Sequence, residues 1–324
     1  MKPPVYVSRR VPARVRARLE DLFEVTIHDA EPPPARSELL AAATGSHGLV
    51  TMLTDNVDDE LLAAAGADLR VVAHYAAGYD TVDVEAATRR GIVVTNTPDV
   101  LTEATAEFTL ALLLGLARRI AAGDRFVRRG GEWSWAPTFM LGSGLDGRTL
   151  GIVGLGRIGT AVARLAQAFG MRVVYTNGSG PRLDVALEWL PLQRLLESSD
   201  AVSLHCPLTP ETHHLIGRAA LRAMRPHAFL VNTARGPLVD EAALAVALPA
   251  GEIAGAALDV FEREPEVTAG LLELENVVLA PHLGSATAEA REAMGMLCAQ
   301  ALESVLLERQ IPPNVVNPEV WRRG

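Results

Sequence analysis

The segment GIVGLGRIG, residues Gly151–Gly159, decides the fold of this 324-residue chain. It places Gly154, Gly156 and Gly159 in a G-x-G-x-x-G spacing, directly after the β-branched run Thr149–Val153. Glycines at these positions permit a tight turn, a close backbone approach to a pyrophosphate and tight packing of a helix on a strand. A segment of helical period and a second strand, MRVVYT, follow in the required order. The sequence therefore predicts a dinucleotide site rather than an ordinary turn.

Strands and helices alternate along almost the whole chain. The expected strands before the glycine loop are VYVS, VTI, GLVTML, RVVAHY and IVVTN, and the later ones are TLGIVGL, RVVYT, AVSLHC, AFLVNT, IAGAALDV and NVVLAPH. Such alternation is typical of parallel sheets covered by helices on both faces. We predict an α/β protein with two doubly wound parallel-sheet domains. One domain, residues 100–286, carries the glycine loop and is inserted into the other, residues 1–99 and 287–324.

Two long helices are expected at the ends of the inserted domain. One is TEATAEFTLALLLGLARRIAAG, Thr102–Gly123, and the other runs from Thr287 to about Arg309 and returns the chain to the first domain. Within the first of them, FTLALLLGL is apolar on more than one face. Because this suits a helix buried between subunits, we expect a homodimer.

Composition limits the classes of partner. The net charge of −9 argues against nucleic acid or an anionic membrane, which would repel the chain. The longest apolar run, Thr109–Ala117, is too short to span a bilayer, and MKPPVYVSRR does not resemble a signal peptide. Cys206 and Cys298 lie far apart and in no metal-ligand spacing. We therefore expect a soluble, cytoplasmic globular protein without a metal site.

The second half of the dinucleotide fingerprint is missing. A carboxylate about 20 residues after the glycines normally binds the adenosine ribose and selects NAD. Here the strand end reads YTNGSG, Tyr175–Gly180, which has no carboxylate, and Arg182 is the nearest cation. Since nothing in this segment would repel a 2′-phosphate, we expect NADP(H) to be favoured, with NAD(H) as the alternative.

Charged side chains follow three later strands. Arg235 lies in VNTARGPLVD, Asp259 and Glu264 lie in ALDVFEREP, and His282 lies in LAPHLGSAT. The carboxyl ends of parallel strands meet at one edge of a sheet, where ligands bind. Beside a nicotinamide, the arginine would bind a substrate carboxylate and the histidine would exchange a proton with a carbonyl oxygen. A glutamate would hold the histidine and favour its protonated form.

This pattern alone leaves alternatives open. A histidine at a strand end is often a packed or capping residue. Spacing does not decide whether Glu262, Glu264 or Glu266 would be its partner, and Arg235 could be one surface arginine among many.

The motifs GIVGLGRIG, VNTARGPLVD, GAALDVFEREP and APHLGSAT, in this order and spacing, resemble those of the D-isomer-specific 2-hydroxyacid dehydrogenases. In the first domain, HYAAGYDTVD and GIVVTNTPDVLTEATAEFTLALLL are similar to that family's substrate loop and domain-crossing helix. TNTPDVLTEATAE, ARRI, GRIG and IPPNVVNPEV are most similar to the glyoxylate/hydroxypyruvate reductase branch. The resemblance covers nearly the whole chain. It implies that residues 100–286 form a Rossmann dinucleotide-binding domain, and that residues 1–99 and 287–324 form a flavodoxin-like substrate-binding domain.

The resemblance implies a catalytic set of Arg235, Glu264 and His282. It also implies that Ala77 and Gly78 offer backbone N–H groups to the substrate carboxylate beside Arg235. Ala77 stands where the family usually has a valine, which would make the pocket slightly roomier. Around this set we predict cofactor contacts for the glycine loop and for residues at strand and helix ends: Thr105, Gly154, Leu155, Gly156, Arg157, Ile158, Gly159, Asn177, Cys206, Thr233, Ala234, Asp259 and Gly284.

The implied activity is hydride transfer from NADPH or NADH to a small 2-oxo acid, glyoxylate or hydroxypyruvate, giving the D-2-hydroxy acid. One alternative is another dehydrogenase of the family, acting on phosphoglycerate, D-lactate or phosphite. Another is a dinucleotide-sensing binding protein, such as the corepressors built on the same fold, which usually add long tails for partner peptides.

Overall fold

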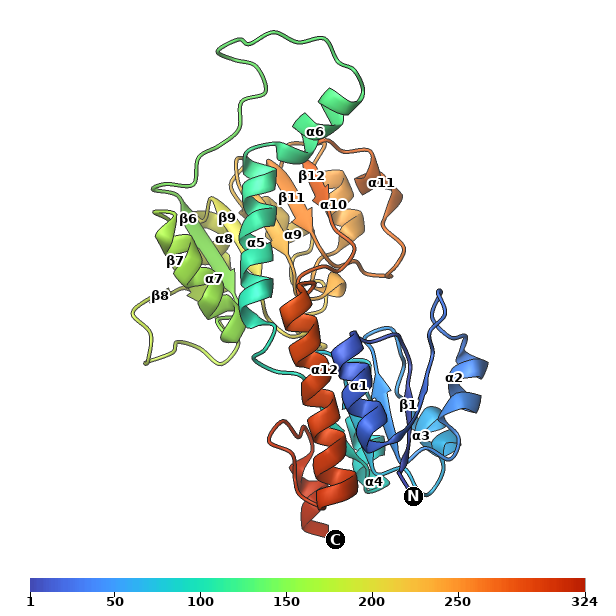
Figure 1. Cartoon of the computed structure of the whole chain (residues 1–324). Coiled ribbons are helices and arrows are strands. Elements are labelled where there is room, and N and C mark those ends of the chain that lie inside the picture. The colour runs from blue at the N-terminus through green and yellow to red at the C-terminus, as the bar shows by residue number, and fades with distance from the viewer. Residues whose placement is uncertain (324) are drawn as a thin grey trace. The chain divides into compact units, whose positions relative to one another are not determined.

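The computed structural model describes residues 1–323, and the chain divides into two compact units. Unit 1 comprises Met1–Leu101 and Ala286–Gly324, and unit 2 comprises Thr102–Ser285. Each unit contains one fully parallel sheet, so the predicted class of two doubly wound α/β domains is confirmed (Figure 1). The assignment of substrate binding to the first unit and dinucleotide binding to the second stays a prediction.

The sheet of unit 1 has five parallel strands in the order β2-β1-β3-β4-β5. This is the flavodoxin-like order, in which the chain reverses direction across the sheet between β1 and β3. The strands are short and rich in valine, and four of them are almost wholly buried. Their bounds are β1 (Pro4–Val7), β2 (Glu24–Ile27), β3 (Gly48–Thr51), β4 (Val71–His74) and β5 (Val93–Thr95).

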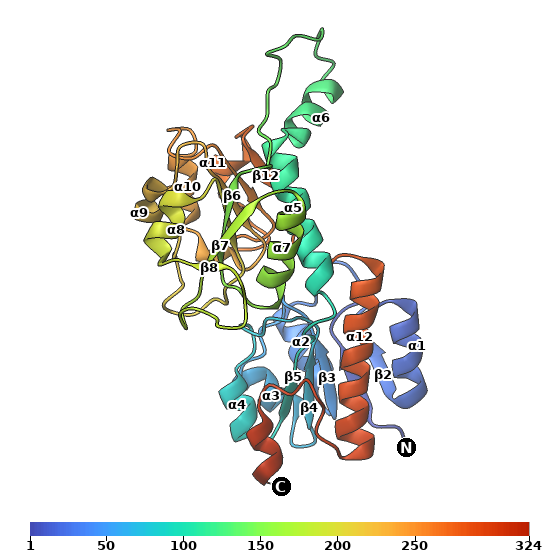
Figure 2. The ribbon, with the colours of Figure 1, turned by 90° about the vertical axis from the view of Figure 1, so that its left-hand side faces the viewer.

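Helices cover both faces of this sheet. On one face α1 and α12 lie side by side, and on the other α2, α3 and α4 bury leucine and alanine side chains against the strands (Figure 2). Asp58 and Asp83 cap α3 and α4 by accepting backbone N–H groups of their first turns. The bounds are α1 (Ala13–Leu22), α2 (Arg36–Ala43), α3 (Asp59–Ala65), α4 (Val84–Arg89) and α12 (Ala288–Glu303).

The sheet of unit 2 has seven parallel strands in the order β12-β11-β10-β9-β6-β7-β8. The chain moves outward from β6 to β8, then returns and continues from β9 to β12 on the other side. The strand order therefore reverses between β6 and β9, the position where Rossmann sheets bind dinucleotides. The bounds are β6 (Thr149–Val153), β7 (Arg172–Thr176), β8 (Glu188–Trp189), β9 (Ala201–Leu204), β10 (Phe229–Asn232), β11 (Gly255–Leu258) and β12 (Val277–Leu279).

Two apolar clusters form the core of unit 2, one on each face of the sheet. The first joins α5 and α7 to the strands, and the second joins α8, α9, α10 and α11 to them. The bounds are α5 (Thr102–Ala117), α6 (Ile120–Arg128), α7 (Arg157–Ala168), α8 (Leu192–Ser198), α9 (Arg218–Ala223), α10 (Glu241–Ala247) and α11 (Ala269–Leu272). A three-residue 3₁₀ helix occupies Gly236–Leu238 in unit 2, and a six-residue 3₁₀ helix, Pro318–Arg323, belongs to unit 1.

The prediction of one helix over Thr102–Gly123 is wrong. The helix α5 ends at Ala117, Arg119 adopts a left-handed φ of 56°, and α6 begins at Ile120. The break coincides with a tertiary contact, because the carbonyl of Ala117 accepts the N–H of Ser143 at 2.8 Å instead of continuing the helix. The helix expected at Thr287 is present as α12, extended by a π-helical turn over Ser304–Glu308. Within residues 1–323, no helix is long and apolar enough to cross a membrane.

Candidate active site

The glycine loop between β6 and α7 fits a dinucleotide pyrophosphate. Gly154 has a φ of +97°, and a Cβ there would lie 2.5 Å from the backbone nitrogen of Cys206, so only glycine is accommodated. At Gly156 an added Cβ would meet no atom within 4 Å, which leaves the outer side of the loop open to a ligand. The N-terminus of α7 follows directly and presents backbone N–H groups there.

Asn177 and Arg182 both contact the glycine loop. The Asn177 side-chain oxygen accepts the N–H of Leu155 at 2.6 Å. The Arg182 guanidinium donates to the carbonyl of Leu155 at 2.9 Å and pairs with Asp184, with Nε 3.0 Å from Oδ1. The structure therefore brings a cation onto the loop. The sequence indicated Arg182 only as the nearest cation along the chain.

Arg235 lies on a loop that two other residues shape. The buried Asn232 donates its side-chain N–H to the carbonyl of Arg235 at 2.8 Å and accepts the N–H of Ala234 at 3.1 Å. At Gly236 a Cβ would lie 1.9 Å from the carbonyl carbon of Phe261. This close approach requires glycine and packs the loop bearing Arg235 against the loop bearing Glu264.

His282 and Glu264 form a hydrogen-bonded pair. The imidazole Nδ1 lies 2.9 Å from Glu264 Oε2, and Glu264 Oε1 accepts the N–H of Phe261 at 3.1 Å. Burial alone would raise the pKa of Glu264, but the hydrogen bond and charge of His282, helped by Arg235, lower it below its usual range. Glu264 is therefore ionised at neutral pH and can hold a protonated imidazole. The His282 and Glu264 side chains are 27% and 37% exposed, so both remain accessible to a ligand.

Glu262 and Glu266, the other two candidates for the partner of His282, make different contacts. Glu262 turns toward α10, where its carboxylate accepts the N–H of Glu241 at 2.8 Å, and it lies 3.2 Å from His214. Glu266 is exposed, and its N–H bonds to the carbonyl of Arg263. Hydrogen-bond geometry thus selects Glu264 as the partner of His282.

Asp259 holds the turn that carries His282. It is 1% exposed, and its two carboxylate oxygens accept the N–H groups of Leu283 at 2.6 Å and Gly284 at 2.8 Å. Burial raises the pKa of Asp259 even though these N–H groups favour its ionised form. His282 adopts a left-handed φ of 55°, which is uncommon for a residue with a side chain. The structure therefore shows Asp259 stabilising the strained backbone at His282, while its cofactor contact stays a prediction.

Several other predicted cofactor residues gather at the same sheet edge. Thr109 bonds both the carbonyl of Thr105 at 2.8 Å and the hydroxyl of Thr233 at 2.9 Å. A Cβ on Gly284 would lie 3.3 Å from a Thr105 methyl carbon. Cys206 abuts Gly154, Ala234 precedes Arg235, and Leu155, Arg157 and Ile158 belong to the loop and the first turn of α7.

The predicted substrate-loop residues belong to unit 1. Ala77 and Gly78 follow β4 and are partly exposed. The carbonyl of Ala77 accepts the side-chain N–H of Asn96 at 2.6 Å, which fixes the loop. Their role in binding a substrate stays a prediction.

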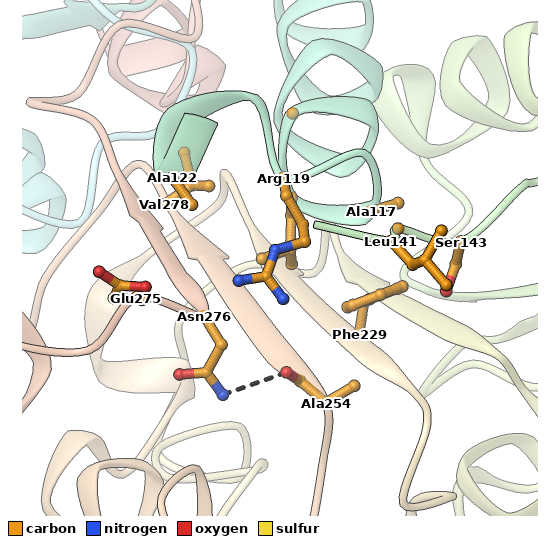
Figure 3. Close-up of a pocket in the computed structure, with 13 residues that line it drawn as sticks. Ala117, Arg119, Ala122, Leu141, Ser143, Phe229, Ala254, Glu275, Asn276 and Val278 are labelled. Carbon is orange, nitrogen blue, oxygen red and sulfur yellow. Dashed lines mark hydrogen bonds between the residues drawn. The ribbon is translucent and has the colours of Figure 1, made fainter. Parts of the chain in front are cut away.

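A cleft of about 200 Å³ lies elsewhere in unit 2. It is lined by residues at the amino ends of β10, β11 and β12, among them Phe229, Ala254 and Asn276, and Figure 3 shows the Arg119 side chain directed into it. Arg235 and His282 follow the carboxyl ends of these strands, so this cleft is separate from the candidate active site.

Comparison with known proteins places the chain in a family. Residues 110–284 match the family model of the D-isomer specific 2-hydroxyacid dehydrogenase NAD binding domain. The chain is 50% identical to glyoxylate reductases of Korarchaeum cryptofilum and Pyrococcus furiosus, with 99% of this chain and 97% of each relative covered. The chain therefore belongs to the D-isomer-specific 2-hydroxyacid dehydrogenases, and it is an NAD(P)-dependent oxidoreductase, as the resemblance implied.

A solved structure is also similar over nearly the whole of both chains. It is an NADPH-dependent glyoxylate/hydroxypyruvate reductase from Sinorhizobium meliloti, in complex with NADP and malonate. The TM-score is 0.86 at 36% identity, covering 98% of this chain and 97% of that one.

Proposed function

We propose that the enzyme reduces a small 2-oxo acid, glyoxylate or hydroxypyruvate, to the 2-hydroxy acid, with the D configuration where the product is chiral. The proposal rests on the hydrogen bond of 2.9 Å between His282 and Glu264. The loop that bears Glu264 packs against the loop that bears Arg235. Full-length similarity to proteins named glyoxylate reductase supports the choice of substrate.

Each residue of the set has a defined task. A reduced nicotinamide cofactor, held by the glycine loop and the N-terminus of α7, supplies hydride when bound. Glu264 accepts Nδ1–H of His282, so the proton available for transfer is on Nε2, and His282 gives it to the substrate carbonyl oxygen. The Arg235 guanidinium binds the substrate carboxylate at two points. For the backbone N–H groups of Ala77 and Gly78 in unit 1, we propose a role in binding a substrate carboxylate.

We further propose that NADP(H) is the preferred cofactor. No carboxylate occupies Thr176–Ser179, and the guanidinium of Arg182 lies against the glycine loop at the carbonyl of Leu155. A cation there would attract a 2′-phosphate, whereas NADH lacks its usual carboxylate partner. Asp184 partly offsets this charge, but its side chain is 68% exposed.

Asn177→Asp is expected to reverse the preference. Aspartate keeps an oxygen acceptor for the N–H of Leu155, so the loop is retained, while its charge repels a 2′-phosphate. The cost to NADPH is on the order of 1–3 kcal/mol, several-fold to a hundredfold in kcat/KM. The measurement is kcat/KM for glyoxylate and hydroxypyruvate with NADPH and with NADH. Gln167→Glu, which adds the same charge at the exposed far end of α7, serves as the matched control. A wild-type enzyme with a strong preference for NADH would refute the proposal.

The expected homodimer is also a proposal. The apolar residues of α5, on which the expectation rested, are largely buried within unit 2. Better support comes from the segment after α6, which projects from unit 2 as a long loop (Figures 1 and 2). Its Trp133 and Trp135 side chains are 61% and 80% exposed, and Leu141 is 64% exposed. A second copy of the chain that covered these apolar side chains would remove them from water.

Sedimentation equilibrium should give twice the 34.5 kDa chain mass, and Trp135→Ser should weaken association of the two copies. A monomer at micromolar concentration would exclude the dimer.

A cytoplasmic location remains our proposal as well. Its support is that Cys206 and Cys298 are both free thiols, as expected in a reducing compartment.

A further inference from the structure

Glu241 is a buried carboxylate outside the catalytic set. It is the first residue of α10 and is 3% exposed. Its Oε1 accepts the N–H of Glu262 at 2.7 Å, and its Oε2 accepts the N–H of Thr268 at 3.2 Å. The carboxylate therefore bridges two points of the chain that lie on either side of Glu264.

The helix itself does not need this side chain as a cap. Asp240 already occupies the N-cap position of α10 and accepts the N–H of Ala243 at 2.8 Å. In addition, the N–H of Glu241 is bonded to the carboxylate of Glu262 at 2.8 Å, so the two glutamates hold each other reciprocally. The contacts of the Glu241 carboxylate are thus directed at the segment 262–268 rather than at its own helix.

We propose that Glu241 is a positioning residue for catalysis: by bridging the N–H groups of residues 262 and 268, it fixes the loop from which Glu264 reaches His282. A hydrogen bond of 2.9 Å tolerates little displacement of either partner, and a loop free to move by about 1 Å would lose it. Glu241 also begins α10 shortly after the loop of Arg235, so it ties the two catalytic loops together. This inference rests on the proposed roles of Glu264 and His282.

The first test is Glu241→Gln. Glutamine offers one oxygen and one amide N–H₂ in place of two oxygens, so one of the two loop N–H groups loses its acceptor. With Glu264 displaced, the protonated imidazole is less favoured, although Asp259 and Arg235, the other charged groups near this pair, stay in place. The expected result is a kcat lowered about tenfold, with the decline of kcat/KM at high pH moved to lower pH and the KM for NADPH unchanged.

A pair of substitutions at Thr268 isolates the hydrogen bond without altering the buried carboxylate. Thr268 has a φ of −55°, which proline can adopt, and its side chain makes no capping bond. Thr268→Pro removes the N–H that Glu241 accepts, whereas Thr268→Ala removes the same hydroxyl and keeps the N–H. We expect the proline variant to show the displaced pH profile and the alanine variant to keep the wild-type one. The two Thr268 variants keep the proposal testable if Glu241→Gln does not fold.

A double-mutant cycle with Glu264→Gln decides whether Glu241 acts through Glu264. If it does, Glu241→Gln lowers kcat less than about twofold further in the Glu264→Gln background. Asp240→Ala, which removes the cap of the same helix, controls for loss of stability and should lower Tm without displacing the pH profile. The positioning role would be overturned if the fold-losses in kcat of Glu241→Gln and Glu264→Gln multiplied in the double variant. A wild-type pH profile in both Glu241→Gln and Thr268→Pro would overturn it as well. A different result, wild-type kcat and pH profile in Glu264→Gln, would refute the proposed roles of Glu264 and His282 themselves.

Discussion

His282→Asn lowers kcat for 2-oxo acid reduction about 10²–10⁴-fold, while NADPH binds nearly as in the wild type. The substitution removes the group that protonates the carbonyl oxygen and leaves the glycine loop untouched. Asparagine tolerates the left-handed φ of 55° at this position better than alanine does, so the Asp259-bound turn should persist.

The measurement is steady-state kinetics together with a fluorescence titration of NADPH. His227→Asn is a matched control, because His227 also pairs with a carboxylate, Asp200, at 2.8 Å, but on the exposed surface before β9 and β10. It should keep wild-type kcat. Near-normal turnover in His282→Asn would remove this histidine from the mechanism.

Arg235→Lys has the second-largest expected effect, a loss of about 10–10²-fold in kcat/KM. Lysine keeps the charge but cannot reproduce the planar two-point contact of a guanidinium with a carboxylate. Because the same contact orients the carbonyl for reduction, we expect KM for the 2-oxo acid to rise and kcat to fall together.

Kinetics with varied 2-oxo acid at saturating NADPH check this result. Arg263→Lys is the control, since Arg263 is exposed in the neighbouring loop beside Glu264. If Arg235→Lys behaves as the wild type does, the arginine does not bind the substrate carboxylate in the manner proposed.

The architecture could be read from the sequence because it repeats a simple pattern. Every strand of four or more residues in the structure coincides with an apolar or β-branched run, and the glycine loop marks where the seven-stranded sheet begins. The two-residue strand β8, Glu188–Trp189, is too short to give such a pattern. The break between α5 and α6 is not predictable from the local sequence, because it coincides with a hydrogen bond from the N–H of Ser143, distant in sequence, to the carbonyl of Ala117.

The candidate site was only partly predictable. Residue type and order singled out Arg235 and His282, but the choice of Glu264 over its neighbours needed the hydrogen-bond geometry or a known family. The roles of Asn232 and Glu241 were invisible in the sequence. Each depends on which backbone N–H groups the fold brings opposite a side chain, and no periodicity encodes that.

The reduction of hydroxypyruvate with NADPH, with chiral chromatography of the product, tests the proposed function most directly. The same assay compares kcat/KM for glyoxylate, hydroxypyruvate, pyruvate and 3-phosphohydroxypyruvate. The proposed function predicts D-glycerate as the product and the highest kcat/KM for glyoxylate or hydroxypyruvate. Formation of L-glycerate, or no oxidation of NADPH or NADH with either of these two acids, would contradict it.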